Sequence, residues 1–179
     1  MPASPVDFGA DLPTIRDYIA ARVRAQAKVK TPIGAVVVGF QVNQAGLLLI
    51  HFDTRDRYDR DGEWTKAFGR NTLKLPHWQE AYEAVAEDGA SFIRLSGKPR
   101  AVRAGAADET VMGLFGAALR AIVHDAFARG MFAPLPLRDD CQLDLEEFDG
   151  NWAWPGGHDA LGRTNILRKM RAARLPAAP

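Results

Sequence analysis

The fold is decided by the stretch Ile33–Thr54, which reads IGAVVVGFQVNQAGLLLIHFDT. Its two apolar halves, Ile33–Val42 and Leu47–Thr54, carry the kind of side chains that suit a pleated and buried surface. The segment between them has the composition of a turn, in which Gly46 can adopt a positive φ. Because both halves are apolar almost without interruption, we expect two adjacent central strands that are covered on both faces.

Helical patterns flank this pair of strands. Apolar residues at helical spacing predict a helix over Thr14–Val29, introduced by Asp11 as its cap and by Pro13 in its first turn. A second helix is predicted from Pro76 to Gly89. A third, with the widest apolar face, is predicted from an Asp108 cap to Gly130. Further elements are expected at Trp64–Phe68 (edge strand), Ser91–Leu95 (strand or helical turn), Cys141–Leu145 (strand with one buried face) and Asn165–Arg174 (basic helix).

Length and composition indicate one globular domain. The chain has 179 residues, of which 47% are hydrophobic and 25% charged, and single domains cluster near about 100–200 residues. The sequence therefore predicts one α+β domain over residues 1–179. We expect a central, mainly antiparallel sheet with helices packed against it, and a loose N-terminal arm at residues 1–10.

Charge and cysteine content narrow the function classes. The 23 basic and 22 acidic residues nearly cancel, which argues against a dedicated binder of bulk nucleic acid. No apolar run approaches the roughly 20 residues that span a bilayer, and no secretory signal is apparent. The single cysteine fits a reducing compartment. We expect a cytoplasmic protein without a membrane partner, and the excess of arginine over lysine suggests a bacterial genome.

A first candidate site lies at the end of the second apolar half. Strand alternation places His51, Asp53 and Arg55 on one face, and a His and an Asp two residues apart can share a metal ion or a proton. A metal-dependent hydrolase would need further ligands, for which the candidates are His77, His124, Asp139 and Asp140. The alternative is an ordinary strand end with an Asp–Arg pair and a solvated histidine.

Two charged surfaces are candidates for binding a protein. The first, called here the basic-aromatic surface, combines arginines with aromatic side chains, as protein–protein hot spots do: Arg55, Arg57, Tyr58, Arg60 and Trp64. The second, called here the acidic surface, consists of Asp144, Glu146 and Glu147 and would attract a basic partner. The alternative for both is a solvated surface without a partner.

Two other features have weaker chemical interpretations. Cys141 alternates with Leu143 and Leu145 and follows two aspartates, so we expect a buried structural thiol rather than a nucleophile. The basic segment Asn165–Arg174, with the nearby tryptophans Trp152 and Trp154, could bind nucleic acid. In the alternative, the apolar residues of that segment pack inward and its arginines face water.

Three parts of the sequence resemble those of small α+β immunity proteins of bacterial polymorphic-toxin systems. They are the paired strands of Ile33–Thr54, the run His51–Arg55 (HFDTR) and the segment Asp61–Thr65 (DGEWT). The resemblance covers about a third of the chain. It implies a cytoplasmic protein that binds a cognate toxin domain and blocks it without catalysis or cofactor. Many nuclease inhibitors of that class are strongly acidic overall, and this chain is not. The leading hypothesis is therefore a non-enzymatic protein-binding module, with the hydrolase and the nucleic-acid binder as alternatives.

Overall fold

The computed structural model describes residues 5–54 and 71–147, and at Gln142, Asp144 and Glu146 it describes the backbone alone. The described elements follow one another in the order β1 (Val6–Asp7), α1 (Phe8–Gln26), β2 (Ile33–Gln41), β3 (Leu47–Asp53), β4 (Leu73–Lys74), α2 (Pro76–Glu87), β5 (Ala90–Ile93), β6 (Pro99–Val102), α3 (Asp108–Ala128) and β7 (Leu137–Glu147).

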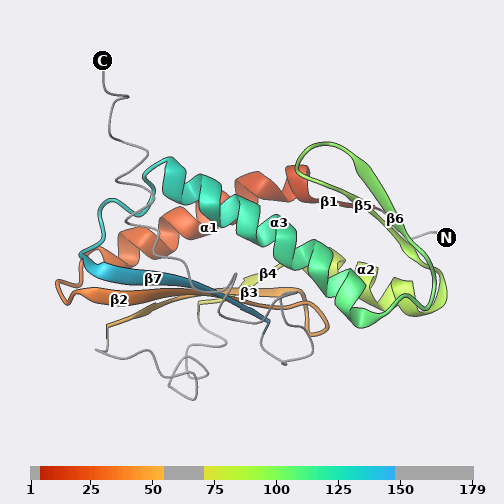
Figure 1. The fold of residues 1–179 in the computed structure, drawn as a ribbon, viewed down its shortest axis with the longest axis horizontal. Helices are drawn as coiled ribbons and strands as arrows, with labels where there is room; N and C mark the ends of the chain where they lie inside the picture. The colour runs from red at the N-terminus through yellow and green to blue at the C-terminus, as the bar shows by residue number, and fades with distance from the viewer. Residues whose placement is uncertain (1–4, 55–70, 148–179) are drawn as a thin grey trace.

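The described strands form two sheets. One has the order β4-β3-β2-β7, and α1 and α3 lie together on one side of it (Figure 1). Within it β2 and β3 are antiparallel, with Val38 opposite Ile50, whereas β2 and β7 are parallel, with Val38 opposite Leu145. The smaller sheet has the order β1-β5-β6. The predicted α+β class is confirmed, with the difference that each of these two sheets contains one parallel pair.

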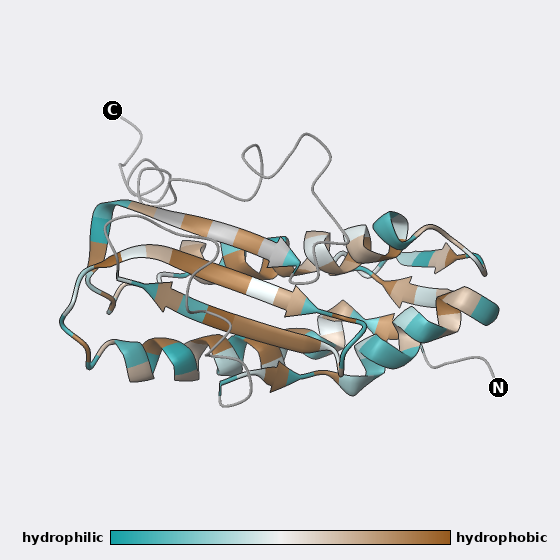
Figure 2. Ribbon diagram, turned by 90° about the horizontal axis from the view of Figure 1, so that it is seen from below, coloured by the Kyte–Doolittle hydropathy of each residue, from teal (hydrophilic) through white to brown (hydrophobic). Residues whose placement is uncertain are grey.

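The central strands are buried on both faces, as their continuous apolar sequence predicts. On the helix side, Val36, Val38 and Phe40 of β2 belong to the main hydrophobic cluster. Val37 of β2 and Leu49 of β3 are also buried, although they lie outside that cluster. Figure 2 shows hydrophobic residues along most of the length of the central strands.

Four aromatic side chains join the helices to the smaller sheet. Phe8 of α1, Trp78 of α2, Phe92 of β5 and Phe115 of α3 are all fully or almost fully buried. The Trp78 and Phe115 ring centroids are 5.0 Å apart, and Phe8 lies 5.7 Å from each of these two rings. Such pairs contribute about 0.5–1.5 kcal/mol each beyond the burial of their area. The cluster therefore holds three helices and a strand together.

The N-terminal region is more ordered than the predicted loose arm at residues 1–10. Val6 pairs with Phe92 in a parallel ladder, and α1 begins at Phe8. The Asp7 side chain caps the helix, because its Oδ1 accepts the backbone N–H groups of Gly9 at 2.8 Å and Ala10 at 3.2 Å. The arm is therefore wrong for residues 6–10, while residues 1–4 lie outside the described part. Asp11 is not the cap that we predicted, since it lies inside the helix.

The other predicted elements differ mainly at their ends. The helix predicted from Pro76 is α2, followed by Gly89 at a φ of 75°. Asp108 is the first residue of α3 rather than its cap, and its charge there suits the positive end of the helix dipole. The strand predicted at Cys141–Leu145 is β7, which is longer at both ends. The elements predicted at Trp64–Phe68 and Asn165–Arg174 lie outside the described residues.

Helix α3 explains the apolar composition of its segment. Among the described helices it is the one long and apolar enough to cross a membrane, with a mean hydropathy of 1.4. Of that window, 56% is buried inside the protein, and the buried residues include Phe115, Leu119 and Ile122. Burial against the sheet and the other helices accounts for this composition without a bilayer.

Candidate functional site

The face of the four-stranded sheet opposite α1 and α3 carries the histidine and aspartate that the sequence singled out. His51 lies opposite Val37 and Asp53 opposite Ala35, while Phe52 between them packs into the hydrophobic cluster on the helix side. The predicted alternation is therefore confirmed for His51, Phe52 and Asp53, while Arg55 lies outside the described residues. His51 is half-buried, and Asp53 is only 3% exposed. A buried carboxylate is costly without partners, and Asp53 does take part in such an interaction. We therefore interpret it as a structural residue at the end of the sheet.

The hydrolase hypothesis needed further ligands beside His51 and Asp53. Within residues 5–54 and 71–147, no group of three His, Cys, Asp or Glu side chains is arranged to hold a metal ion. His77, His124, Asp139 and Asp140 are all described and do not complete such a group. In this part of the chain, the fold does not bring together the ligands that a metal centre at His51 would require.

The chain that leads to the basic-aromatic surface ends its strand at a defined position in the sheet. The residues of this surface, Arg55, Arg57, Tyr58, Arg60 and Trp64, lie outside the described residues. The chain reaches them from Asp53, which pairs with Ala35 near the start of β2. Ala35 pairs in turn with Gln142 of β7. The segment that carries this surface therefore starts at the same end of the sheet as the first part of β7.

The acidic surface is only partly compatible with the fold. In the backbone register Asp144 lies opposite Val37, and Glu146 lies opposite Gly39; their side chains lie outside the description. Glu147 is opposite Phe40, which packs toward the helices, and it is only 6% exposed. The prediction of Glu147 as an exposed contact is therefore wrong, because the alternation of the strand turns it toward the core.

Cys141 is a buried structural residue, as predicted. Its side chain is 4% exposed and belongs to the main hydrophobic cluster. Burial raises the pKa of the Cys141 thiol to about 11, and the negative charge of the neighbouring Asp140 adds to this rise. A thiol with such a high pKa is almost entirely protonated near neutral pH and is therefore a poor nucleophile.

This environment predicts slow chemical labelling of Cys141 in the native protein. At pH 8 a pKa of about 11 leaves roughly one thiol in a thousand ionised, against roughly a quarter for a free thiol. We expect native Cys141 to react with an aromatic disulfide reagent more than about 100-fold more slowly than in urea-unfolded protein. Since the chain has one cysteine, the absorbance of the released thiolate measures this residue alone. Equal rates in the two states would contradict the buried environment.

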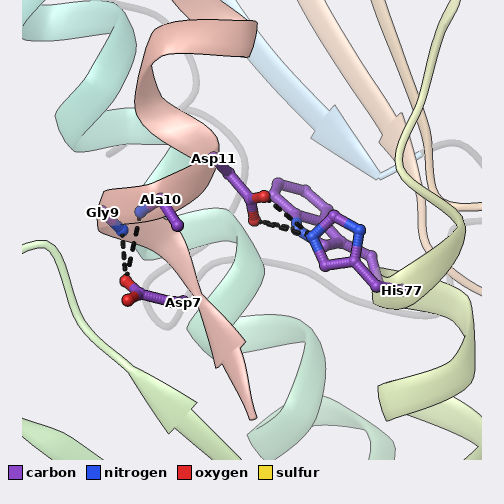
Figure 3. A network of polar contacts seen from close by, with 6 residues as sticks. Asp7, Gly9, Ala10, Asp11 and His77 are labelled. Atoms are coloured by element: carbon purple, nitrogen blue, oxygen red, sulfur yellow. Dashed lines mark hydrogen bonds and ion pairs between the residues drawn. The ribbon is translucent and has the colours of Figure 1, made fainter. Parts of the chain in front are cut away.

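A polar network that sequence analysis missed joins α1 to α2 (Figure 3). Asp11 of α1 accepts a hydrogen bond from the indole Nε1–H of Trp78 at 2.7 Å. The Nε2 atom of His77 lies 2.8 Å and 3.0 Å from the two oxygens of the same carboxylate. Asp11 and His77 are 66 residues apart in sequence, so no local pattern could reveal the pair. The only sequence signal is that Asp11 lies near the predicted start of a helix, and this position favours the interpretation of Asp11 as a cap.

The Asp11–His77 pair has the form of a base oriented by a carboxylate, but the described residues supply no nucleophile to it. The His77 side chain is 43% exposed, and its hydrogen bonds are the two to Asp11 within the described part of the chain. Nucleophilic catalysis requires a hydroxyl or thiol within hydrogen-bond reach of the base. The network is therefore assigned a structural role, in which one carboxylate satisfies the buried indole N–H of Trp78.

Comparison with known proteins adds no relative. No family model, no curated protein and no solved structure matches this chain. The class of protein is therefore defined by the fold alone, an α+β protein with helices on one side of a mixed four-stranded sheet.

Proposed function

We propose that this chain is a non-enzymatic protein-binding module of the immunity type, which binds a cognate toxin domain in the bacterial cytoplasm and blocks it. The observation that carries the proposal is the strand order β3-β2-β7. It places β3, which ends at Asp53 two residues before the basic-aromatic surface, and β7, which carries Asp144 and Glu146, in one sheet with only β2 between them.

The register supports simultaneous contact of both segments with one partner. Neighbouring strands lie about 4.8 Å apart, so β3 and β7 are about 10 Å apart across β2. Asp144 of β7 is level with His51 of β3, because both lie opposite Val37, so β7 runs alongside the strand that leads to the basic-aromatic segment. A standard protein interface buries about 800 Å² on each partner, an area large enough to include Asp144, Glu146 and the end of β3 at Asp53.

The composition of the two segments suits tight and selective binding. Tyrosine, tryptophan and arginine are the residue types that dominate binding hot spots, and the basic-aromatic surface contains all three. Patches of opposite charge steer the encounter and reject wrong partners. After the correction for Glu147, Asp144 and Glu146 remain as the candidate contacts of the acidic surface.

The proposal is tested by capture and then by substitution. Tagged full-length protein is used to capture partners from its native lysate, and the captured proteins are identified by mass spectrometry. The expected result is one dominant stoichiometric protein that survives high salt. Its toxicity on expression, and the relief of that toxicity by this chain, then measure neutralisation directly. Recovery of no such protein would contradict an immunity role.

The triple variant Tyr58→Ala/Arg60→Ala/Trp64→Ala tests the binding surface. If only two of these three side chains are hot spots, their loss costs at least about 3–4 kcal/mol, which corresponds to an affinity loss of at least about 100-fold. The matched control is Lys28→Ala/Lys30→Ala, which changes two exposed residues after the end of α1 and should leave the affinity unchanged. Calorimetric titration against the captured toxin domain measures both. An unchanged affinity of the triple variant would remove this surface from the proposal.

A further inference from the structure

We propose that a cleft between α3 and the β5–β6 hairpin is a second docking site, which takes an acidic segment of the protein partner with one large apolar side chain as its anchor. This proposal rests on the proposed function in one respect, because that function identifies the protein partner as the toxin domain. The cleft lies away from the β2–β3–β7 surface, because the hairpin stands beside α3 on the side away from the four-stranded sheet (Figure 1).

The cleft is an apolar hollow of about 200 Å³. Phe8 and Ala118 form its buried floor, and the half-buried side chains of Leu95 and Leu114 form its walls. On α3 the exposed Ala117 and Ala121 are one helical turn apart. Their small side chains leave the space that forms this side of the cleft. A second hollow shares Ala117 and Ala121 with the cleft, is also lined by Arg120 and His124, and is not part of the proposed site.

The hairpin carries a row of positive charge on the face whose Phe92 packs against α3. The Arg94 N–H donates to the Lys98 carbonyl, so these two residues lie opposite one another, and Arg100 lies opposite Phe92. Side chains that are opposite or two residues apart in a hairpin share one face. Arg94, Lys98 and Arg100 therefore leave the hairpin on the same face as Phe92, whose ring packs 5.5 Å from that of Phe115 of α3.

These three cations are exposed. Arg94 itself lines the cleft. Neither it, Lys98 nor Arg100 forms an ion pair within residues 5–54 and 71–147. By contrast, Arg129 at the end of α3 and Arg138 on β7 are each paired with an aspartate. Unpaired cations gathered beside an apolar hollow are complementary to carboxylates that flank an apolar side chain.

The size and lining of the cleft distinguish between possible occupants. Pockets for drug-sized molecules measure roughly 300–1,000 Å³, so a hollow of about 200 Å³ better fits one anchor side chain, as in protein hot spots. Single-stranded nucleic acid would need exposed aromatic rings for stacking. The aromatic ring that lines this cleft, Phe8, is only 1% exposed. An acidic peptide segment is therefore the occupant that the charge and the lining favour.

The site is tested without any toxin domain by nuclear magnetic resonance of the isotope-labelled full chain. The probes are two capped synthetic hexapeptides, EEFLEE and KKFLKK. The acidic peptide should shift the resonances of Arg94, Leu114, Ala117 and Ala121 with a millimolar dissociation constant, and the basic peptide should not. No shift at these residues, or equal shifts with both peptides, would overturn the proposal. Shifts confined to the hairpin with a single-stranded oligonucleotide and absent with EEFLEE would also overturn it, in favour of nucleic acid.

Two sets of variants test the positive charge of the hairpin and the apolar hollow separately. Arg94→Glu/Arg100→Glu should weaken binding of EEFLEE at least tenfold, and the control Arg24→Glu, an exposed position on α1, should not. Ala117→Trp fills the hollow and should abolish the shifts, whereas Ala128→Trp at the exposed end of α3 should preserve them. If both alanine variants bind equally well, the cleft is not the site. These variants leave the basic-aromatic surface unchanged, so failure here is distinguishable from failure of the proposed function.

Discussion

Gly46→Ala should destabilise the protein by at least about 3 kcal/mol, within the range of the most disruptive single substitutions. Gly46 has a φ of 57°, and the left-handed conformation costs a residue with a side chain about 1–2 kcal/mol. A Cβ atom at this position would lie 2.0 Å from the carbonyl oxygen of Leu75 and 2.8 Å from its carbonyl carbon. Because both are backbone atoms, no side-chain rotation can relieve the overlap.

Relief would require the β2–β3 turn to separate from the start of α2. That contact includes the hydrogen bond from the Leu75 N–H to the Gly46 carbonyl at 2.9 Å. It also includes the bond from the Ala45 N–H to Oε1 of Gln79 at 2.7 Å. The substitution therefore disturbs the position of a whole helix, and the loss should exceed that of conformational strain alone.

The matched control for this substitution is Gly97→Ala in the β5–β6 turn. Gly97 has a similar φ of 75°, and no atom lies within 4 Å of the position of its Cβ. Its replacement should cost only the conformational term, about 1–2 kcal/mol. Urea denaturation followed by circular dichroism gives both free energies of unfolding. Equal losses in the two variants would show that the close approach of Leu75 contributes nothing.

Asp11→Ala should cost about 2–3 kcal/mol, since it leaves the buried indole N–H of Trp78 without an acceptor. Trp78 has no exposed surface, and Asp11 provides the acceptor of its N–H at 2.7 Å. The indole cannot rotate out to water without breaking its packing on Phe8 and Phe115. The unsatisfied donor therefore stays buried, and its desolvation is not repaid.

Two further variants divide this network into its parts. Asp11→Asn keeps an acceptor for Trp78 and should lose less stability than Asp11→Ala. His77→Ala removes a half-exposed partner and should cost at most about 1 kcal/mol. Denaturation in urea ranks the three variants, and the indole ¹⁵N–¹H resonance of Trp78 should move most in Asp11→Ala. If His77→Ala lowered the free energy of unfolding more than Asp11→Ala, then the hydrogen bond to the Trp78 indole would not be the main contribution of Asp11.

Local patterns were sufficient for most of the secondary structure. The strands β2 and β3, the helices α2 and α3, and the alternation of Cys141, Leu143 and Leu145 all follow from runs of residues that are close in sequence. The short strands β1, β4 and β6 were not predicted. Each has only two to four residues, and β1 exists because Val6 and Asp7 pair with residues Phe92 and Ile93, far along the chain. No local periodicity marks such a strand.

In the candidate site, too, local patterns predicted some features and missed others. Alternation alone placed His51 and Asp53 on one strand face, because the period of a strand is a property of the backbone. The same reasoning failed at Glu147. Its sequence neighbours suggested one acidic surface, whereas its strand alternation and its register with Phe40 place it among buried residues. Whether an acid is exposed depends on which layer covers that face.

The order of residues along the chain accounts for the hydrophobic periodicities, and with them for the central strands, the core helix α3 and the buried state of Cys141. Tertiary structure alone decided three other features. It paired Asp11 with Trp78, turned Glu147 inward, and placed Arg94 in the lining of an apolar cleft. The physical reason is sequence distance. Periodicity arises from neighbours a few residues apart, whereas these features arise where segments many residues apart meet.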